Sequence, residues 1–177
     1  MKPNKLIFLS LSLCLLLIPS CKTNDPAGTY AAWKLQNESY FSNMKDSTGY
    51  VLYNIPENQG GGSYYYKITT PGNQASVSPL YNNQVKVNYR GKLINQVVFD
   101  QTYSGLMPPM DSISTPGVFY ANQLIRGWTL NLMQMKVGET RRIVLPQELG
   151  YGATGAGQDI APYSTTVWEV QLVKVNN

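Results

Sequence analysis

The feature that most constrains this chain is a repeated alternation of apolar and polar side chains along its second half. Residues 84–93 carry the clearest case, since apolar side chains at Val85, Val87, Tyr89 and Leu93 alternate there with polar or charged ones. A period of two is typical of a β-strand with one buried face. Further segments rich in aromatic and β-branched residues predict more strands at residues 50–53, 64–68, 142–145 and 166–175.

Only one segment in this region has the spacing of a helix. In residues 126–135 the side chains of Trp128, Leu132 and Met135 fall on one side, and Gly138 follows as a stop signal. Many antiparallel strands with one short helix predict an α+β fold in which a sheet packs on a helix. The length of 177 residues allows one such domain with a real hydrophobic core.

The first twenty residues do not fit a globular fold. A basic start precedes an apolar run at residues 6–18, which has the length of a secretory signal and is too short to span a bilayer. The run ends at Ile18-Pro19-Ser20-Cys21, which resembles a bacterial lipobox except at Pro19. We therefore predict a lipoprotein signal peptide at residues 1–20 and lipidation of Cys21. The alternative is an ordinary signal peptide that is cut elsewhere.

Lipidation would anchor the mature chain firmly in a membrane of the cell envelope, because each buried methylene contributes about 0.8 kcal/mol. Lys22 follows the cysteine where inner-membrane retention is associated with aspartate, and this favours the outer membrane. Residues 22–28 predict a short tether. Residues 30–45 predict a helix with an aromatic side, which packs on the domain, acts as a spacer or mediates dimerisation. The expected organisation is a signal peptide at 1–20, a tether and helix at 21–48, and a domain at 49–177.

Charge and composition exclude several classes of function. The net charge of +4 is spread along the chain, and a protein that binds nucleic acid needs clustered cations. The adjacent pair Arg141 and Arg142 is expected on a solvated strand face. The chain has no histidine, and its two cysteines are Cys14 and Cys21, so the mature domain has neither a Ser-His nucleophile pair nor a thiol metal site. We expect no metal and no cofactor.

Residues 150–155 read GYGATG, which has the spacing of a dinucleotide-binding loop. Such a loop leaves a strand and opens directly into a helix whose N-terminus meets the phosphates. Here the glycines follow a turn and precede AGQDIAP, which contains Gly157 and Pro162 and cannot begin a helix. Glu169 is placed roughly where a ribose-binding acid would be wanted, but it lies in an alternating strand. The nucleotide hypothesis fails on this context.

Several motifs, in order and spacing, resemble the FKBP-type peptidyl-prolyl isomerases over about residues 64–175. They are VKVNYRGKL at 85–93, VFD at 98–100, LIRGW at 124–128, MKVGE at 135–139, YGATG at 151–155 and the closing segment 162–175. The resemblance implies an antiparallel half-barrel sheet wrapped around one short helix, with an apolar pocket between them. It also gives the glycines at 150–155 another purpose, since a tight loop would project Tyr151 into that pocket.

The resemblance implies a catalytic group and a substrate-binding group. The catalytic group is Asp100, Ile125, Trp128 and Tyr151. The substrate-binding group is Tyr89, Phe99, Phe119, Leu124, Ile160 and Trp168. Trp128 is implied as the pocket floor, the Ile125 N–H and the Tyr151 hydroxyl as donors to substrate carbonyls, and Asp100 as the carboxylate that orients them. Any one of these aromatic residues could instead serve packing alone. Trp168 stands where the family usually has phenylalanine and is expected to narrow the pocket.

The implied function is acceleration of Xaa-Pro bond rotation in proline-containing polypeptide clients of the cell envelope. The same resemblance implies binding of a macrolide inhibitor. One alternative is an FKBP-like chaperone or client-binding lipoprotein without catalysis. Another is a glycan-binding lipoprotein, suggested by thirteen tyrosines and three tryptophans. Residues 101–118 are longer than the usual connection and predict either a surface insert or a lip that contacts clients.

Overall fold

The computed structural model describes residues 26–107, 109 and 114–176. The predicted signal peptide, Cys21 and most of the tether lie outside the described residues. Within them the chain forms one antiparallel sheet of seven strands. The strands are β1 Val51–Asn54, β2 Ser63–Thr70, β3 Gln84–Leu93, β4 Val98–Gln101, β5 Gly117–Tyr120, β6 Thr140–Leu145 and β7 Thr166–Asn176.

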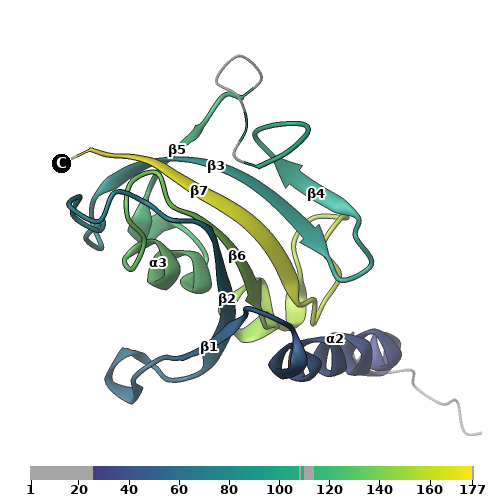
Figure 1. Ribbon diagram of the computed structural model, residues 1–177. Coiled ribbons are helices and arrows are strands. Elements are labelled where there is room, and N and C mark those ends of the chain that lie inside the picture. The colour runs from purple at the N-terminus through teal and green to yellow at the C-terminus, as the bar shows by residue number, and fades with distance from the viewer. Residues whose placement is uncertain (1–25, 108, 110–113, 177) are drawn as a thin grey trace, which may run out of the picture.

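The strand order is β1-β2-β6-β7-β3-β4. The seventh strand, β5, pairs with residues 84–87 of β3, on the same edge of β3 that pairs with β4 at residues 90–92. The two longest strands, β3 and β7, form the centre and pair from Gln84↔Asn176 to Leu93↔Thr166. The sheet curves over the short helix α3 Arg126–Leu132 (Figure 1). These observations confirm the predicted α+β architecture of a curved antiparallel sheet around one short helix.

The main core fills the space between the concave face of the sheet and α3. Alternate side chains over part of each strand enter it or pack against it, as the pattern predicted: Val85, Val87 and Tyr89 of β3, and Trp168, Val170 and Leu172 of β7. Its most deeply buried members include Tyr64, Val85, Val87, Leu132, Met135, Ile143, Leu145, Val170 and Leu172. Helix α3 ends at Leu132, three residues before the predicted end, but Met135 is still fully buried in the turn that follows.

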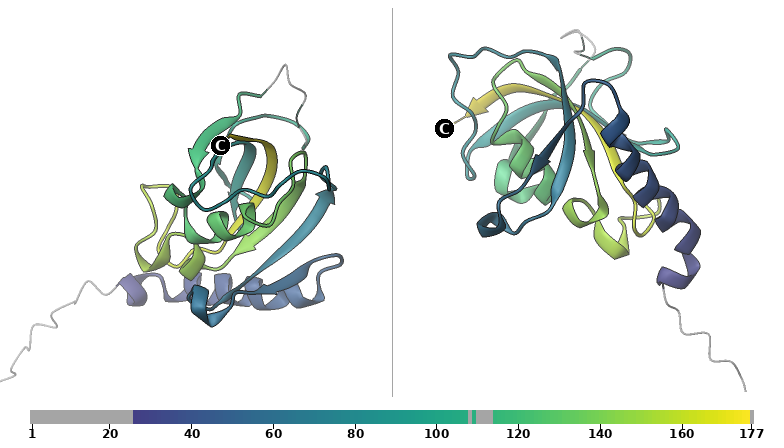
Figure 2. Two further views of the ribbon diagram at one scale, coloured as in Figure 1. Left: turned by 90° about the vertical axis from the view of Figure 1, so that its left-hand side faces the viewer. Right: turned by 60° about the horizontal axis from the view of Figure 1, so that its bottom comes forward.

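The helix predicted at residues 30–45 is present and packs on the domain. It comprises α2 Ala31–Asn43 and a 3₁₀ turn at Met44–Asp46. The short helix α1 Pro26–Thr29 precedes it, so the last residues of the predicted tether are helical. Met44 packs with Tyr65 and Val144, whose strand neighbours Tyr64 and Ile143 point the other way into the main core. Helix α2 therefore covers part of the outer face of the sheet, opposite α3 (Figure 2). Among the described residues, no helix combines the length and apolarity that crossing a membrane requires.

The expectation of a solvated face for both Arg141 and Arg142 is wrong for Arg141. Neighbouring residues of a strand point to opposite faces, so only Arg142 faces outward. Arg141 is 5 % exposed and pairs with the equally buried Glu139. Its guanidinium also donates to Asn131 Oδ1 (3.2 Å) and the Gln134 carbonyl (2.9 Å), so the buried charge is fully accommodated.

Candidate functional site

A cavity of about 220 Å³ opens between the concave face of the sheet and α3, and we call it the aromatic pocket. The sheet contributes β3, β4, β5 and β7, and the remaining walls come from α3, the turn before it and the loop after β6. The lining residues are Tyr89, Asp100, Phe119, Gln123, Leu124, Ile125, Trp128, Tyr151 and Trp168.

Two indole rings and a phenol form the buried side of the aromatic pocket. The Trp128 ring stands edge-on to Tyr89 at 5.3 Å and to Trp168 at 5.0 Å between centroids. Both indoles are almost completely buried. Trp168 Nε1 donates to Thr166 Oγ1 at 2.9 Å, which fixes that ring against the wall. Trp168 is larger than the phenylalanine that the family resemblance led us to expect, yet its side chain lines the cavity and does not fill it.

Gly91 allows the aromatic rings to lie this close to the central strand. Phe99 and Trp168 meet edge-to-face over it, with their centroids 4.9 Å apart. A Cβ atom at Gly91 would lie 2.5 Å from Trp168 Cζ3 and 2.6 Å from Phe99 Cζ. No other residue fits there without displacing both rings, so the glycine of the YRG segment is a packing requirement.

The polar groups of the aromatic pocket are few and are held in place. Tyr89 donates its hydroxyl proton to Asp100 Oδ2 at 2.8 Å. Burial, and then the hydrogen bond to Asp100, raise the pKa of the Tyr89 phenol far above its usual range. Burial and the charge of Asp100 also raise the pKa of Tyr151. Both phenols therefore stay protonated at neutral pH and can act only as neutral hydrogen-bonding groups.

Three groups that line the pocket have no hydrogen-bond partner among the described residues. Within the described part of the chain, neither the Ile125 backbone N–H nor the Tyr151 hydroxyl has a hydrogen-bond partner. The Trp128 indole N–H is also buried without one. An apolar cavity with unpaired donors on its walls suits a ligand that is mostly apolar but carries carbonyl groups.

The structure brings eight of the ten predicted site residues to the cavity wall. Phe99 and Ile160 are the exceptions. Phe99 lies behind the lining, edge-on to Tyr151 and Trp168. Ile160 is buried, and its backbone pairs with Ala156, so it stabilises the loop that carries Tyr151 and is not part of the wall. Sequence reasoning missed Gln123, because an exposed polar residue ahead of the helix carries no periodic signal.

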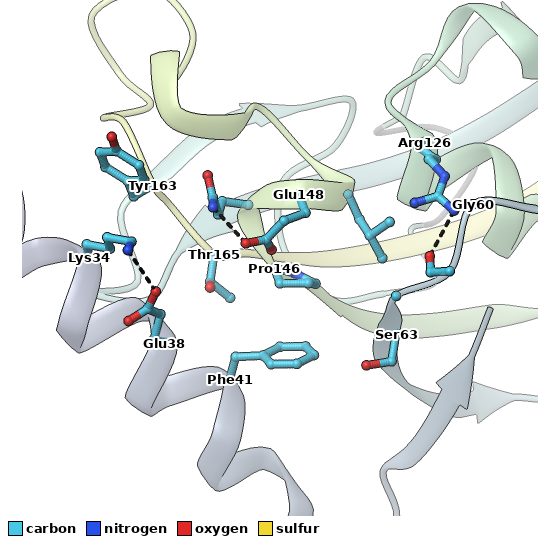
Figure 3. A pocket seen from close by; sticks show the side chains of 14 residues that line it. Lys34, Glu38, Phe41, Gly60, Ser63, Arg126, Pro146, Glu148, Tyr163 and Thr165 are labelled. Atoms are coloured by element: carbon cyan, nitrogen blue, oxygen red, sulfur yellow. Dashed lines mark hydrogen bonds and ion pairs between the residues drawn. The ribbon is translucent and has the colours of Figure 1, made fainter. Parts of the chain in front are cut away.

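Two of the larger cavities differ from the aromatic pocket in their chemistry. The outer groove, about 500 Å³, runs between α2 and the loops at residues 60–63 and 146–149. Figure 3 shows its charged side chains, including the Lys34–Glu38 ion pair (3.4 Å), around the ring of Phe41. The distal hollow, about 590 Å³, is lined by Gln59, Tyr81, Asn122, Leu124, Arg126, Thr129, Leu130 and Met133. In the described residues, no group of three or more acidic, cysteine or histidine side chains could hold a metal ion.

Comparison with known proteins gives a consistent picture. The model of the family described as FKBP-type peptidyl-prolyl cis-trans isomerase matches residues 76–173. The chain is 39 % identical over 97 residues to the FKBP-type 22 kDa peptidyl-prolyl cis-trans isomerase of Escherichia coli, covering 55 % of this chain and 43 % of that protein. It is 30 % identical over 142 residues to the outer membrane protein MIP of Legionella longbeachae, covering 80 % of this chain and 54 % of that protein.

A solved structure of a peptidyl-prolyl cis-trans isomerase from Pseudomonas syringae pv. tomato is also similar. It superposes with a TM-score of 0.67 at 27 % sequence identity, covering 84 % of this chain and 96 % of that one. The chain spans about half the length of the curated relatives described above. The fold is therefore shared over nearly the whole of the solved relative, whereas the longer relatives carry sequence that has no counterpart in the alignment.

Proposed function

The chain belongs to the FKBP-type peptidyl-prolyl cis-trans isomerase family, and on that basis we propose that it accelerates rotation about Xaa-Pro bonds of polypeptide clients. One observation carries the proposal. The aromatic pocket joins an aromatic wall to unpaired hydrogen-bonding groups, among them the Ile125 N–H and the Tyr151 hydroxyl. Proline is apolar and its neighbouring carbonyls accept hydrogen bonds, so this combination suits a prolyl segment.

The chemistry of this reaction fits the groups that the pocket offers. Rotation of the imide crosses a barrier of about 18–20 kcal/mol because it breaks the C–N conjugation, and no bond to a nucleophile is needed. Each reduction of about 1.4 kcal/mol speeds the rotation tenfold. The planar imide is more charge-separated than the twisted one. A pocket that excludes water therefore disfavours the planar state relative to the twisted state.

Each polar residue has a separate role in this proposal. The Ile125 N–H and the Tyr151 hydroxyl donate to client carbonyls on either side of the rotating bond. Asp100 accepts from Tyr89, which fixes the phenol against the Trp128 floor and places a carboxylate beside the rotating imide. Because Tyr89 and Tyr151 stay protonated and no step transfers a proton, the rate should change little between about pH 6 and pH 9.

The test is the cis/trans exchange rate of a short prolyl peptide with the purified protein. Asp100→Ala and Tyr151→Phe should each lower kcat/KM about tenfold or more, because each removes a polar group from the pocket wall and a loss of about 1.4 kcal/mol of transition-state stabilisation is a factor of ten. Asp46→Ala removes an exposed carboxylate near the end of α2 and serves as the matched control. A folded wild-type protein that leaves the exchange rate at its uncatalysed value would refute the enzymatic proposal.

The alternative function is client binding without catalysis. A glycan-binding role is less well supported, since most aromatic rings of the described residues are buried or packed against the core clusters. If the protein binds a macrolide but leaves the prolyl exchange rate at its uncatalysed value, client binding without catalysis is supported. The same measurement series therefore separates the two functions.

We also propose that the protein acts in the cell envelope, anchored through a lipidated Cys21. Two features support this: the lipobox-like segment, and the name of the Legionella longbeachae relative, an outer membrane protein. Fatty-acid labelling of the full chain in a bacterial host should be lost in Cys21→Ser. Labelling that persists in this variant would contradict the anchor.

A further inference from the structure

The aromatic pocket is too small to hold much more than the prolyl residue. Its volume of about 220 Å³ lies below the range of about 300–1,000 Å³ that is common for small-molecule sites. An extended client advances about 3.3–3.6 Å per residue, so the residues beside the proline must leave the pocket within one or two positions. The surface next to the pocket rim therefore decides how the rest of the client is held.

The distal hollow begins at that rim. Leu124 is half-buried and lines both cavities, so the two cavities adjoin at this residue. Beyond Leu124 the hollow exposes large apolar side chains: Tyr81 is 59 % exposed and Met133 is 37 % exposed. Leu80, next to Tyr81, is 64 % exposed. Apolar surface of this kind, continuous with a binding pocket, is typical of an interaction site.

The charges around the distal hollow favour a neutral polypeptide. Arg126 is its only ionisable lining residue apart from Tyr81. The Arg126 Nη2 donates to the carbonyls of Gln59 (2.6 Å) and Gly61 (2.9 Å), and Arg126 lines both the distal hollow and the outer groove, in which Figure 3 shows its side chain. The remaining polar side chains include the amides of Gln59 and Asn122, which can pair with peptide groups of an extended chain.

We propose that the client polypeptide continues from the aromatic pocket across Leu124 into the distal hollow, where Tyr81, Leu130 and Met133 bind an apolar client side chain. This inference rests on the proposed prolyl-bond function. The occupant is the client itself, because the hollow adjoins the pocket that holds the proline. The distal hollow then makes the protein select clients with an apolar residue near the proline, beyond the reach of the aromatic pocket.

The experiment compares a short peptide, with one residue on each side of proline, and a long peptide with about four residues on each side, several of them apolar. The wild-type protein should have a KM about tenfold lower for the long peptide. Tyr81→Ala and Met133→Ala should each reduce this long-to-short advantage several-fold, because each removes apolar surface that the client would cover. Leu52→Ala is the matched control, since Leu52 is an exposed apolar residue on β1, outside the lining of both cavities.

The outcomes are distinguishable. An unchanged advantage in both variants, or an equal KM for the two peptides with wild-type protein, overturns the inference. If no peptide is isomerised, the proposed catalysis fails, and fluorescence anisotropy of the labelled long peptide then tests the hollow alone: weaker binding by Tyr81→Ala but not Leu52→Ala supports it. Sedimentation that shows Tyr81→Ala abolishing self-association, with peptide affinity unaltered, assigns the hollow to a second copy and also overturns the inference.

Discussion

The glycines of the segment GYGATG at 150–155 have unequal roles. Gly155 has φ +68° and ψ −159°, a conformation that is almost exclusive to glycine. A Cβ atom there would also lie 2.1 Å from the Ile160 carbonyl oxygen. Gly152 has φ +65°, but a Cβ at that position would meet no atom within 4 Å. The tight approach of backbone segments at Gly155 is what shapes the loop that carries Tyr151.

The residue-scale prediction compares Gly155→Ala with Gly152→Ala. Gly152→Ala should cost about 1–2 kcal/mol of unfolding free energy, the usual penalty of a left-handed residue with a Cβ. Gly155→Ala should cost clearly more, because the Ile160 carbonyl must also move. Urea unfolding followed by tryptophan fluorescence measures both. Equal losses in the two variants would contradict this account of the loop.

At the scale of elements, α2 is attached to the loop that ends at β7 through polar contacts in addition to packing. Asn37 is 1 % exposed. Its Oδ1 accepts from the Thr165 N–H at 2.7 Å, and its carbonyl accepts from Thr165 Oγ1 at 3.2 Å. Trp33 Nε1 donates to Ser164 Oγ at 3.0 Å. Tyr163 in turn donates its N–H to the Gly152 carbonyl at 3.0 Å, which connects α2 to the loop beside Tyr151.

The element-scale prediction is that Asn37→Ala destabilises the protein by about 1–3 kcal/mol, since the buried Thr165 N–H loses its acceptor. The amide of Thr165 should also exchange with solvent faster. Hydrogen exchange and urea unfolding provide the two readouts, and Gln36→Ala, at an exposed position one residue away, is the control. Unaltered exchange at Thr165 in Asn37→Ala would show that this contact does not hold the loop.

At the scale of the whole molecule, one carboxylate joins several elements on the outer face of the sheet. Glu169 of β7 pairs with Arg142 of β6 at 2.6 Å and with Arg90 of β3 at 3.8 Å. The Tyr103 hydroxyl, from the segment after β4, donates to it at 2.9 Å. Tyr103 is 3 % exposed, so this part of the predicted 101–118 insert is anchored to the sheet.

This cluster predicts how stability depends on pH. Burial alone would raise the pKa of Glu169, but hydrogen bonds from Arg142 and Tyr103 outweigh it and bring the pKa below the ordinary value. A lowered folded-state pKa stabilises the protein above the unfolded pKa of 4.5, and this contribution is lost as pH falls through the folded pKa. Glu169→Gln should therefore weaken the dependence of unfolding free energy on pH below about 4.5. If the unfolding free energy of Glu169→Gln falls as steeply with decreasing pH as that of the wild type, this prediction is wrong.

Several features of the fold follow from local patterns. The alternation in residues 84–93 and 166–175 predicts β3 and β7, and the helical spacing from Arg126 predicts α3, because the face that a side chain takes is determined by backbone period. The family motifs also identify most of the aromatic side chains that line the pocket. Most of these aromatic residues lie within the motifs themselves, so a short stretch of sequence is enough to identify each one.

Other features depend on contacts between distant segments, and only the tertiary structure decided them. Asn37 is buried because Thr165, 128 residues away, lies against it, and no periodicity in α2 predicts a buried amide. Arg141 stays buried because Glu139, two residues before it, supplies the compensating charge and Asn131, on the separate element α3, accepts a hydrogen bond from its guanidinium. The sequence by itself determined the positions of five strands, of both main helices and of most of the aromatic wall, but it predicted no strand at β4 or β5. The cavity and its shared rim at Leu124 arise only when the sheet curves over α3, because a hollow is a property of surfaces brought together from separate parts of the chain.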